Sequence, residues 1–179
     1  MKAKAFALVM SFQLLLATAF AQKNAGLGAL LNKNAEFIFP QTTEKIAAVL
    51  GVKTIIRNNE NDGERYAEWI TPSGLGVYTN VDDKNTVKEI WFSIPDDKFL
   101  IVSGLPYNLI LNKTTVQETL AKFNKYKVKK TKPNLYGTLE GGTKLEVKIG
   151  ERYVTLFFDS KNVLNSIYVL RSFIDPAAG

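Results

Sequence analysis

Residues 82–92 read DDKNTVKEIWF, and residues 159–169 read DSKNVLNSIYV, so the same pattern occurs twice without a gap. Each copy opens with D-x-K-N, which is typical of a tight turn because Asp and Asn side chains bond to nearby backbone groups and tolerate left-handed conformations. Apolar and polar residues then alternate, which predicts a strand with one buried face. The pattern therefore predicts two strands of similar design, each preceded by a tight turn.

The sequence upstream of each copy predicts a short amphipathic helix, over residues 41–51 and 113–123. Both segments contain a Thr-Thr pair near their start, and Thr is a good N-cap because its hydroxyl accepts a hydrogen bond from the first turn. Apolar residues then recur at helical spacing. They are Ile46, Val49 and Leu50 in the first helix, and Val116, Leu120 and Phe123 in the second.

Several strand-like runs separate each predicted helix from its final strand. In the first copy they cover residues 52–57, 65–70 and 75–81, divided by the turn signals NNENDG and TPSG. In the second copy they cover residues 127–130, 136–139, 143–149 and 153–158. We therefore predict an α+β fold made of two tandem repeats, each a short helix followed by a roughly four-stranded antiparallel sheet.

The predicted organisation of the chain has six parts. They are a signal peptide (1–21), an N-terminal segment (22–40), repeat 1 (41–95), a joint (96–112), repeat 2 (113–172) and a C-terminal tail (173–179). Within the N-terminal segment, the run Phe37-Ile38-Phe39 is expected to dock on the core.

The first 21 residues have the features of an export signal. Lys2 and Lys4 precede an apolar stretch that ends in Ala19-Phe20-Ala21, an A-x-A cleavage pattern. The alternative is a permanent membrane anchor, for which the stretch is marginal because a span needs about 20 apolar residues. We expect cleavage before Gln22, a periplasmic or secreted bacterial protein, and no stable membrane anchor after cleavage.

The chain has no Cys and no His. Disulfides, thiol nucleophiles, imidazole bases and sites that need thiolate or imidazole ligands are therefore excluded. The sequence also has no G-x-S-x-G elbow, no S-x-x-K dyad and no phosphate loop. We expect no catalytic residue, no cofactor and no metal.

Paired carboxylates could still catalyse glycoside hydrolysis without Cys or His. The pairs Asp82/Asp83 and Asp96/Asp97 lie beside turns, where Asp is expected for backbone reasons. A weak calcium site at Asp82, Asp83 and Asn85 is a minor alternative.

The formal net charge is +6, and without Lys2 and Lys4 the predicted mature chain has 21 Lys and Arg against 17 Asp and Glu, a mildly basic +4; its one dense basic run is KYKVKKTK at residues 125–132. This run is typical of a strand whose lysines face solvent. We do not expect nucleic acid as a partner, because recognition would need a larger basic patch and the compartment is wrong. Attraction to an anionic lipid or an acidic glycan is the alternative.

Period-two alternation assigns faces to the predicted strands. On the last strand of repeat 1, Lys88, Ile90, Phe92 and Ile94 are expected to face the helices, with Val87, Glu89, Trp91 and Ser93 on the other face. On the last strand of repeat 2, Val163, Ile167 and Val169 are expected to face the helices, with Leu164, Ser166, Tyr168 and Leu170 opposite.

Three aromatic residues, Tyr78, Trp91 and Tyr168, are thereby predicted to point away from the helices, together with Glu89. Trp and Tyr are enriched in interface hot spots, so these four residues are the candidate partner-binding site. Two alternatives leave no such site: the two sheets fold against each other, or the N-terminal segment covers them. The favoured interpretation of Glu68, Glu89, Glu146 and Lys148 is that each is an ordinary solvated sheet residue, and a charged border made by the four is the alternative.

The segment Gly104–Phe123 carries a family resemblance. Its Leu105-Pro106, Leu109, Thr114-Thr115, Val116 and Leu120 fit a short, degenerate pattern L-P-x-G-L-x-x-x-M-T-x-x-E-V-x-x-x-L-G-x-P that precedes the sheet in related bacterial proteins. Asn108 stands in place of the Gly, Lys113 stands in place of the Met, and Asn124 follows Phe123 where Leu-Gly is expected. With the tandem pattern, this segment resembles the fold group of the beta-lactamase inhibitory protein and the outer-membrane assembly lipoprotein BamE.

The resemblance implies a protein binder, since members of this group inhibit enzymes, assemble envelope complexes or neutralise toxins. We predict an inhibitor or immunity-type protein that binds one exported enzyme or toxin. An envelope scaffolding factor similar to BamE is an alternative, although the lipid-modified Cys of those proteins is absent here. A carrier of lipid or another small ligand is the third hypothesis.

Overall fold

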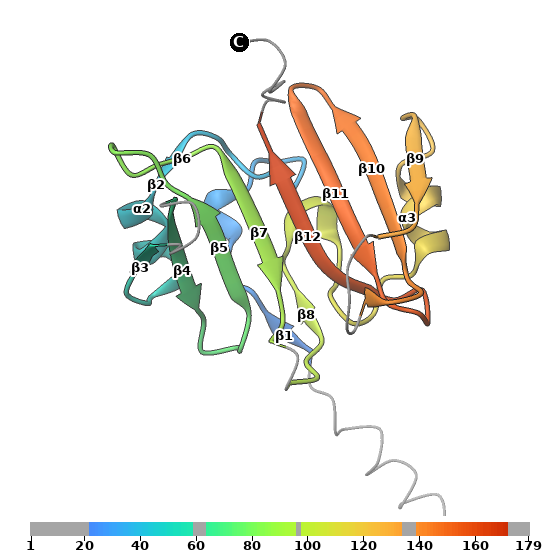
Figure 1. Cartoon of the computed structure of the whole chain (residues 1–179), viewed down its shortest axis with the longest axis horizontal. Helices are drawn as coiled ribbons and strands as arrows, with labels where there is room; N and C mark the ends of the chain where they lie inside the picture. Colours follow the sequence, from blue (N-terminus) through green and yellow to red (C-terminus); the bar gives the residue numbers. More distant parts are fainter. Residues whose placement is uncertain (1–21, 59–63, 96–97, 134–138, 172–179) are drawn as a thin grey trace, which may run out of the picture.

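The computed structural model describes residues 22–58, 64–95, 98–133 and 139–171 (Figure 1). The predicted signal peptide (1–21) and C-terminal tail (173–179) lie outside these residues, as do most of the predicted strand at 136–139 and the pair Asp96/Asp97.

The main element of the fold is one eight-stranded antiparallel sheet with the strand order β3-β4-β5-β7-β12-β11-β10-β9 (Figure 1). Its strands are β3 (Ile55–Asn58), β4 (Arg65–Ile70), β5 (Gly76–Asn80), β7 (Glu89–Ser93), β9 (Val128–Thr131), β10 (Thr143–Ile149), β11 (Arg152–Phe158) and β12 (Leu164–Leu170). Two small ladders accompany it, β1 (Lys23–Asn24) with β8 (Val102–Ser103), and β2 (Gln41–Thr42) with β6 (Thr86–Val87). The helices described are α2 (Thr43–Leu50) and α3 (Val116–Lys122), with 3₁₀ turns η1 (Gly28–Leu30) and η2 (Pro106–Asn108).

The prediction of two tandem repeats, each with its own four-stranded sheet, is wrong. Strands β7 and β12 pair antiparallel over five residue pairs, from Ser93 with Ser166 to Glu89 with Leu170, so all eight strands form one sheet. A sheet edge presents unpaired N–H and C=O groups, and pairing two such edges satisfies both. Sequence periodicity reports which face of a strand is buried but says nothing about its edges.

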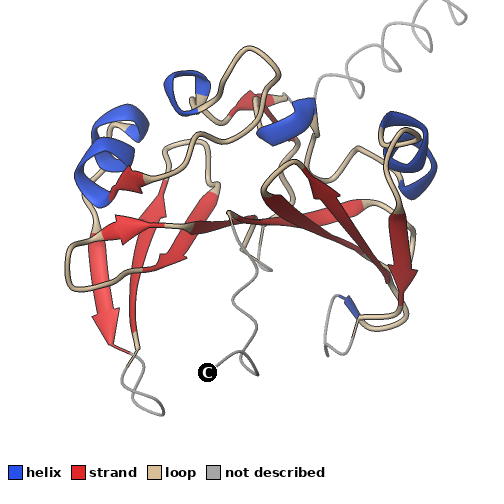
Figure 2. Ribbon diagram, turned by 90° about the horizontal axis from the view of Figure 1, so that it is seen from above, coloured by secondary structure: helices blue, strands red, loops and turns tan. Residues whose placement is uncertain are grey.

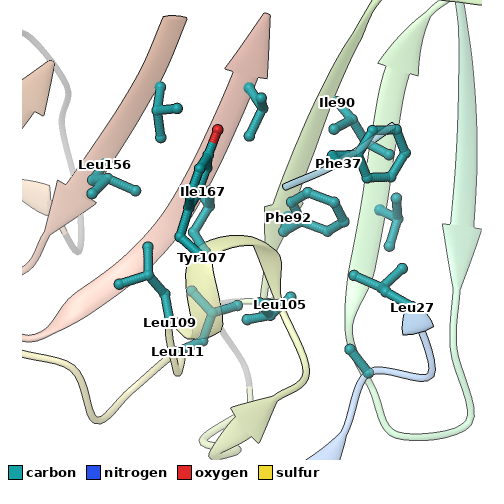
Figure 3. Packing of buried hydrophobic residues seen from close by; sticks show 14 of the residues in the cluster. Leu27, Phe37, Ile90, Phe92, Leu105, Tyr107, Leu109, Leu111, Leu156 and Ile167 are labelled. Atoms are coloured by element: carbon teal, nitrogen blue, oxygen red, sulfur yellow. The ribbon is translucent and has the colours of Figure 1, made fainter. Parts of the chain in front are cut away.

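One face of the sheet carries the core. Figure 2 shows the helices on one side of the sheet, while both ends of the sheet bend toward the other side. Side chains at the centre of the helix side are fully buried, and Figure 3 shows several of them packed together. They include Trp69, Val77, Ile90, Phe92, Val154, Leu156, Ile167 and Val169.

Both predicted helices are present with the predicted caps. The Thr42 hydroxyl accepts a hydrogen bond from the Lys45 amide at 3.3 Å, and Thr115 forms a reciprocal capping box with Glu118. Leu120 does not face the core as expected but is 37% exposed, and Thr119 takes the buried position. No helix in the described ranges is long and apolar enough to cross a membrane.

The N-terminal segment packs on the helix side of the sheet. Leu27, Leu30 and Phe37 are fully buried, and the Phe37 ring lies 6.0 Å from that of Phe92. The predicted docking of this segment is thus seen for Phe37, whereas Ile38 is 37% exposed. The part of the segment that is described covers the core and not the opposite face.

Local irregularities overturn four of the predicted face assignments, including that of Val163, which was expected in the core but is half-buried and does not pack against it. Val87 is fully buried and Lys88 is exposed, because β6 ends at Val87 and β7 begins at Glu89, so the alternation does not run through. Leu164 is buried in the core because the register shifts beside Phe158, with which it pairs. The extra residue at such a bulge interrupts the alternation, so residues on its two sides no longer follow one continuous pattern of faces.

The continuous sheet predicts that the protein unfolds as one unit. Phe92 lies on β7, one of the two central strands that join the halves of the sheet. Phe92→Ala should lower the free energy of unfolding by about 4 kcal/mol, because the variant loses buried apolar surface and leaves a cavity. Amides in β5 and in β11 should lose protection together in native-state hydrogen exchange. The matched control, Ile56→Ala on the edge strand, should cost under about 1 kcal/mol because Ile56 is 42% exposed. Separate unfolding of the two ends of the sheet would contradict the prediction.

Candidate binding site

One side chain from each strand of the main sheet stands in a single row on the face opposite the helices. Residues directly paired in neighbouring antiparallel strands lie on the same face with their Cβ atoms about 5 Å apart. The row contains, in strand order, Ile55, Glu68, Tyr78, Trp91, Tyr168, Thr155, Glu146 and Lys129. Each of these residues is half-buried or exposed. We call the face that bears this row the open face.

Aromatic rings occupy the centre of the open face. Trp91 is paired with Tyr78 on one side and with Tyr168 on the other. Its ring centroid lies 5.6 Å from that of Tyr168, and it stacks at 5.2 Å on Phe157. These contacts fix the orientation of the indole, so Trp91 presents a preformed surface.

Glu89 lies two residues before Trp91 on β7, and its carboxylate accepts a hydrogen bond from the Tyr168 hydroxyl. Burial, followed by this hydrogen bond and the charge of Glu89, raises the pKa of the Tyr168 phenol well above its usual range. The phenol therefore stays protonated at neutral pH and serves as a hydrogen-bond donor. The pair forms a polar group beside the aromatic rings.

The ring of Tyr78 lies over Gly76 on its own strand. A Cβ at position 76 would collide with the Tyr78 phenol, so the absence of a side chain at Gly76 makes room for the ring. Burial is the main cause that raises the pKa of Tyr78, with the charge of Glu68 adding to it and a hydrogen bond with Ser93 opposing it. Tyr78 is thus also a neutral phenol at neutral pH.

These side chains line a pocket of about 480 Å³ on the open face. Its lining residues are Tyr66, Tyr78, Thr79, Asn80, Glu89, Trp91, Ser93 and Tyr168. Of these eight described residues, four are aromatic, one is acidic and none is basic. The pocket combines aromatic walls with a single carboxylate.

Charged pairs border the aromatic centre. On one side Arg57 Nε lies 2.9 Å from Glu68, and on the other side Glu146 lies 3.1 Å from Lys144 and 3.6 Å from Lys129. The Lys148 ammonium lies 5.1 Å from the centroid of the Tyr153 ring. Glu68, Glu146 and Lys148, the residues of the alternative charged border, thus lie on the open face.

The structure brings together all four residues predicted for the partner-binding site, Tyr78, Glu89, Trp91 and Tyr168. The sequence analysis did not identify Tyr66, which lines the same pocket. Tyr66 lies two residues before Glu68 on β4, so period-two alternation places both on one face. The sequence left two alternatives in which this face is covered. In the described residues the two sheets do not fold against each other, because the strands form one sheet, and the N-terminal segment packs on the other side of that sheet.

The region proposed for weak calcium binding is occupied by turn contacts. The Asp82 carboxylate accepts hydrogen bonds from the amides of Lys84 and Thr86 at 3.0 and 2.8 Å, and it lies 3.7 Å from Lys88. The backbone hydrogen bonds are the main cause that lowers the pKa of Asp82. Within the described ranges no group of three or more acidic side chains could hold a metal ion.

The raised pKa of Tyr168 predicts a stability change at high pH. The unfolded phenol ionises near pH 10, whereas the folded phenol ionises higher, so its contribution is present below about pH 10 and is lost as pH rises further. Between about pH 9 and pH 11, wild type should therefore lose more stability than Tyr168→Phe, as measured by urea unfolding. Tyr78 and Tyr107 remain in both proteins, which makes the difference specific to Tyr168. Equal losses in both proteins would refute it.

Comparison with known proteins gives no assignment: no protein-family model, no curated protein and no solved structure matches this chain. The resemblance to the fold group of the beta-lactamase inhibitory protein and BamE therefore stays a prediction. The function has to be argued from the geometry of the open face.

Proposed function

We propose that this chain is an exported, non-enzymatic protein-binding module that binds one partner through the open face of its sheet. The observation that carries the proposal is the row of Tyr78, Trp91 and Tyr168, which three neighbouring strands hold side by side and half-exposed. Aromatic residues held in this way lose little entropy on binding and dominate the energetics of interfaces.

The surroundings of the aromatic centre support a macromolecular partner. Ile55 and Ile70 lie on the open face beyond the pocket and are 43% and 37% exposed. A small ligand in the pocket would leave them in water, whereas a protein surface would cover them. Charged side chains also flank the aromatic centre, such as Glu68 in its ion pair with Arg57, and mixed polar and apolar surroundings of this kind occur around the apolar centre of protein interfaces.

The form of this function that we favour is an inhibitor or immunity-type protein acting on an exported enzyme or toxin. A rigid sheet that presents a preformed aromatic surface suits tight binding, because little ordering is needed on association. A carrier of lipid would need an enclosed apolar cavity. The pocket of the open face instead contains a carboxylate, and this favours the binding module.

The binding surface is tested with a partner identified by capture from envelope and secreted fractions and then purified. In calorimetric titrations of the purified pair, Trp91→Ala and Tyr168→Ala should each weaken binding by about 30-fold or more, since a hot-spot residue contributes about 2 kcal/mol.

The matched control is Tyr126→Ala, which truncates a 43% exposed aromatic residue before β9, away from the open face. This variant should bind the partner as wild type does. A partner whose affinity falls with Tyr126→Ala but not with Trp91→Ala would refute the proposed surface while keeping a binding function.

The export part of the proposal is tested on the full chain. Expression in a bacterium should yield a periplasmic or secreted protein whose N-terminus is Gln22, because cleavage follows the A-x-A pattern at residues 19–21. Intact-mass measurement and N-terminal sequencing check this. Ala21→Pro should block processing, and an unprocessed wild-type chain in the cytoplasm would contradict the proposal.

A further inference from the structure

We infer that the pocket of the open face receives a basic side chain, an arginine or a lysine, from the partner protein. This inference rests on the proposed function, because it takes the occupant to be part of a protein. It goes further by naming the chemistry that the pocket recognises, which is a cation held between aromatic rings and a carboxylate.

The walls of the pocket suit a cation. Tyr66, Tyr78, Trp91 and Tyr168 contribute aromatic rings to it. The face of an aromatic ring carries partial negative charge and attracts an ammonium or guanidinium group, most strongly when the group is taken out of water. Trp91 provides the best ring for this purpose and is already held in place by Phe157.

Charge complementarity points in the same direction. Among the described residues of the lining, Glu89 is the one charged side chain, and it lies in a chain with an excess of positive charge. The contact described for its carboxylate is the neutral phenol of Tyr168, and none of the ion pairs found in the described residues involves Glu89. The nearby Glu68 is already paired with Arg57. A negative charge is therefore left available in the pocket.

The surroundings of the pocket favour a side chain of a protein over a free cation. A volume of about 480 Å³ leaves room for an arginine side chain, and the exposed Ile55 and Ile70 lie outside the pocket on the same face, where a protein surface would cover them. Arginine suits the walls best, because its planar guanidinium stacks on aromatic rings while it hydrogen-bonds to a carboxylate.

The experiment uses capped arginine (N-acetyl-arginine methylamide) as the probe and capped citrulline, its uncharged isostere, as the control. Binding to the purified protein is followed by the two indole N–H signals in a ¹H–¹⁵N spectrum. Trp69 is an internal reference, because it is fully buried and donates to the Thr54 hydroxyl at 2.9 Å. Capped arginine should shift the Trp91 signal in a saturable way and leave the Trp69 signal in place, and capped citrulline should shift neither.

Glu89→Gln removes the charge and keeps an oxygen that can accept from Tyr168. The variant should bind capped arginine with an affinity about tenfold lower than that of wild type, as expected when one charged hydrogen-bond partner is lost. Glu151→Gln, in the turn between β10 and β11, removes an exposed charge elsewhere and should have no effect. If Glu89→Gln does not fold, a salt series on wild type replaces it, and the affinity for capped arginine should then fall as ionic strength rises.

The outcomes separate the two proposals. Equal shifts by arginine and citrulline, or no saturable shift of the Trp91 signal, would overturn the inference. With the purified partner, Glu89→Gln should weaken binding about tenfold, and substitution of one basic residue of the partner should abolish the effect of Glu89→Gln. A partner that depends on Trp91 but is indifferent to Glu89→Gln would overturn the cation pocket and leave the proposed function standing.

Discussion

The pairing of β7 with β12 is the interaction on which the rest of the structure depends. Its five residue pairs join two sets of four strands into one sheet, and they set Trp91 directly opposite Tyr168. The same register places Phe92 opposite Ile167 on the other face, in the middle of the core. Because side chains alternate along a strand, one ladder of backbone hydrogen bonds fixes both the centre of the core and the centre of the open face.

The two faces of the sheet differ because the helices and the N-terminal segment, as far as the structure describes the chain, cover one face and not the other. Helices α2 and α3, the 3₁₀ turns and the N-terminal segment lie on the core side, where Leu27, Phe37 and Phe92 are fully buried (Figures 2 and 3). On the open face, rings and long polar side chains stand half-exposed. The core supplies stability while the open face keeps its aromatic groups half-exposed.

The pocket of the open face is lined by residues from strands far apart in the sequence. Tyr66, Trp91 and Tyr168 come from strands β4, β7 and β12, and Glu89 binds the phenol of Tyr168 from across the β7–β12 pair. Glu89 and Trp91 lie in the first copy of the repeated pattern and Tyr168 holds the position of Trp91 in the second copy, whereas Tyr66 lies outside both copies. A pocket with aromatic walls and one carboxylate arises only when the strands pair in this register.

Local chemistry could be predicted from the sequence because it depends on neighbours along the chain. The caps at Thr42 and Thr115 were predicted in this way, and so was the outward facing of Tyr78 and Trp91. The same reasoning was wrong at Val87 and Leu164, where a strand break and a bulge interrupt the alternation.

By itself, the sequence determined the caps, most of the strands and the residue types available for chemistry, since the absence of Cys and His holds in any fold. The tertiary structure decided that the strands form one sheet and not two, and that Tyr66 joins Glu89 and Trp91 in one pocket. The physical reason is that strand pairing is made by backbone groups, which are the same at every residue. Hydrophobic patterning therefore specifies which face is buried, but only the folded chain decides which edges meet.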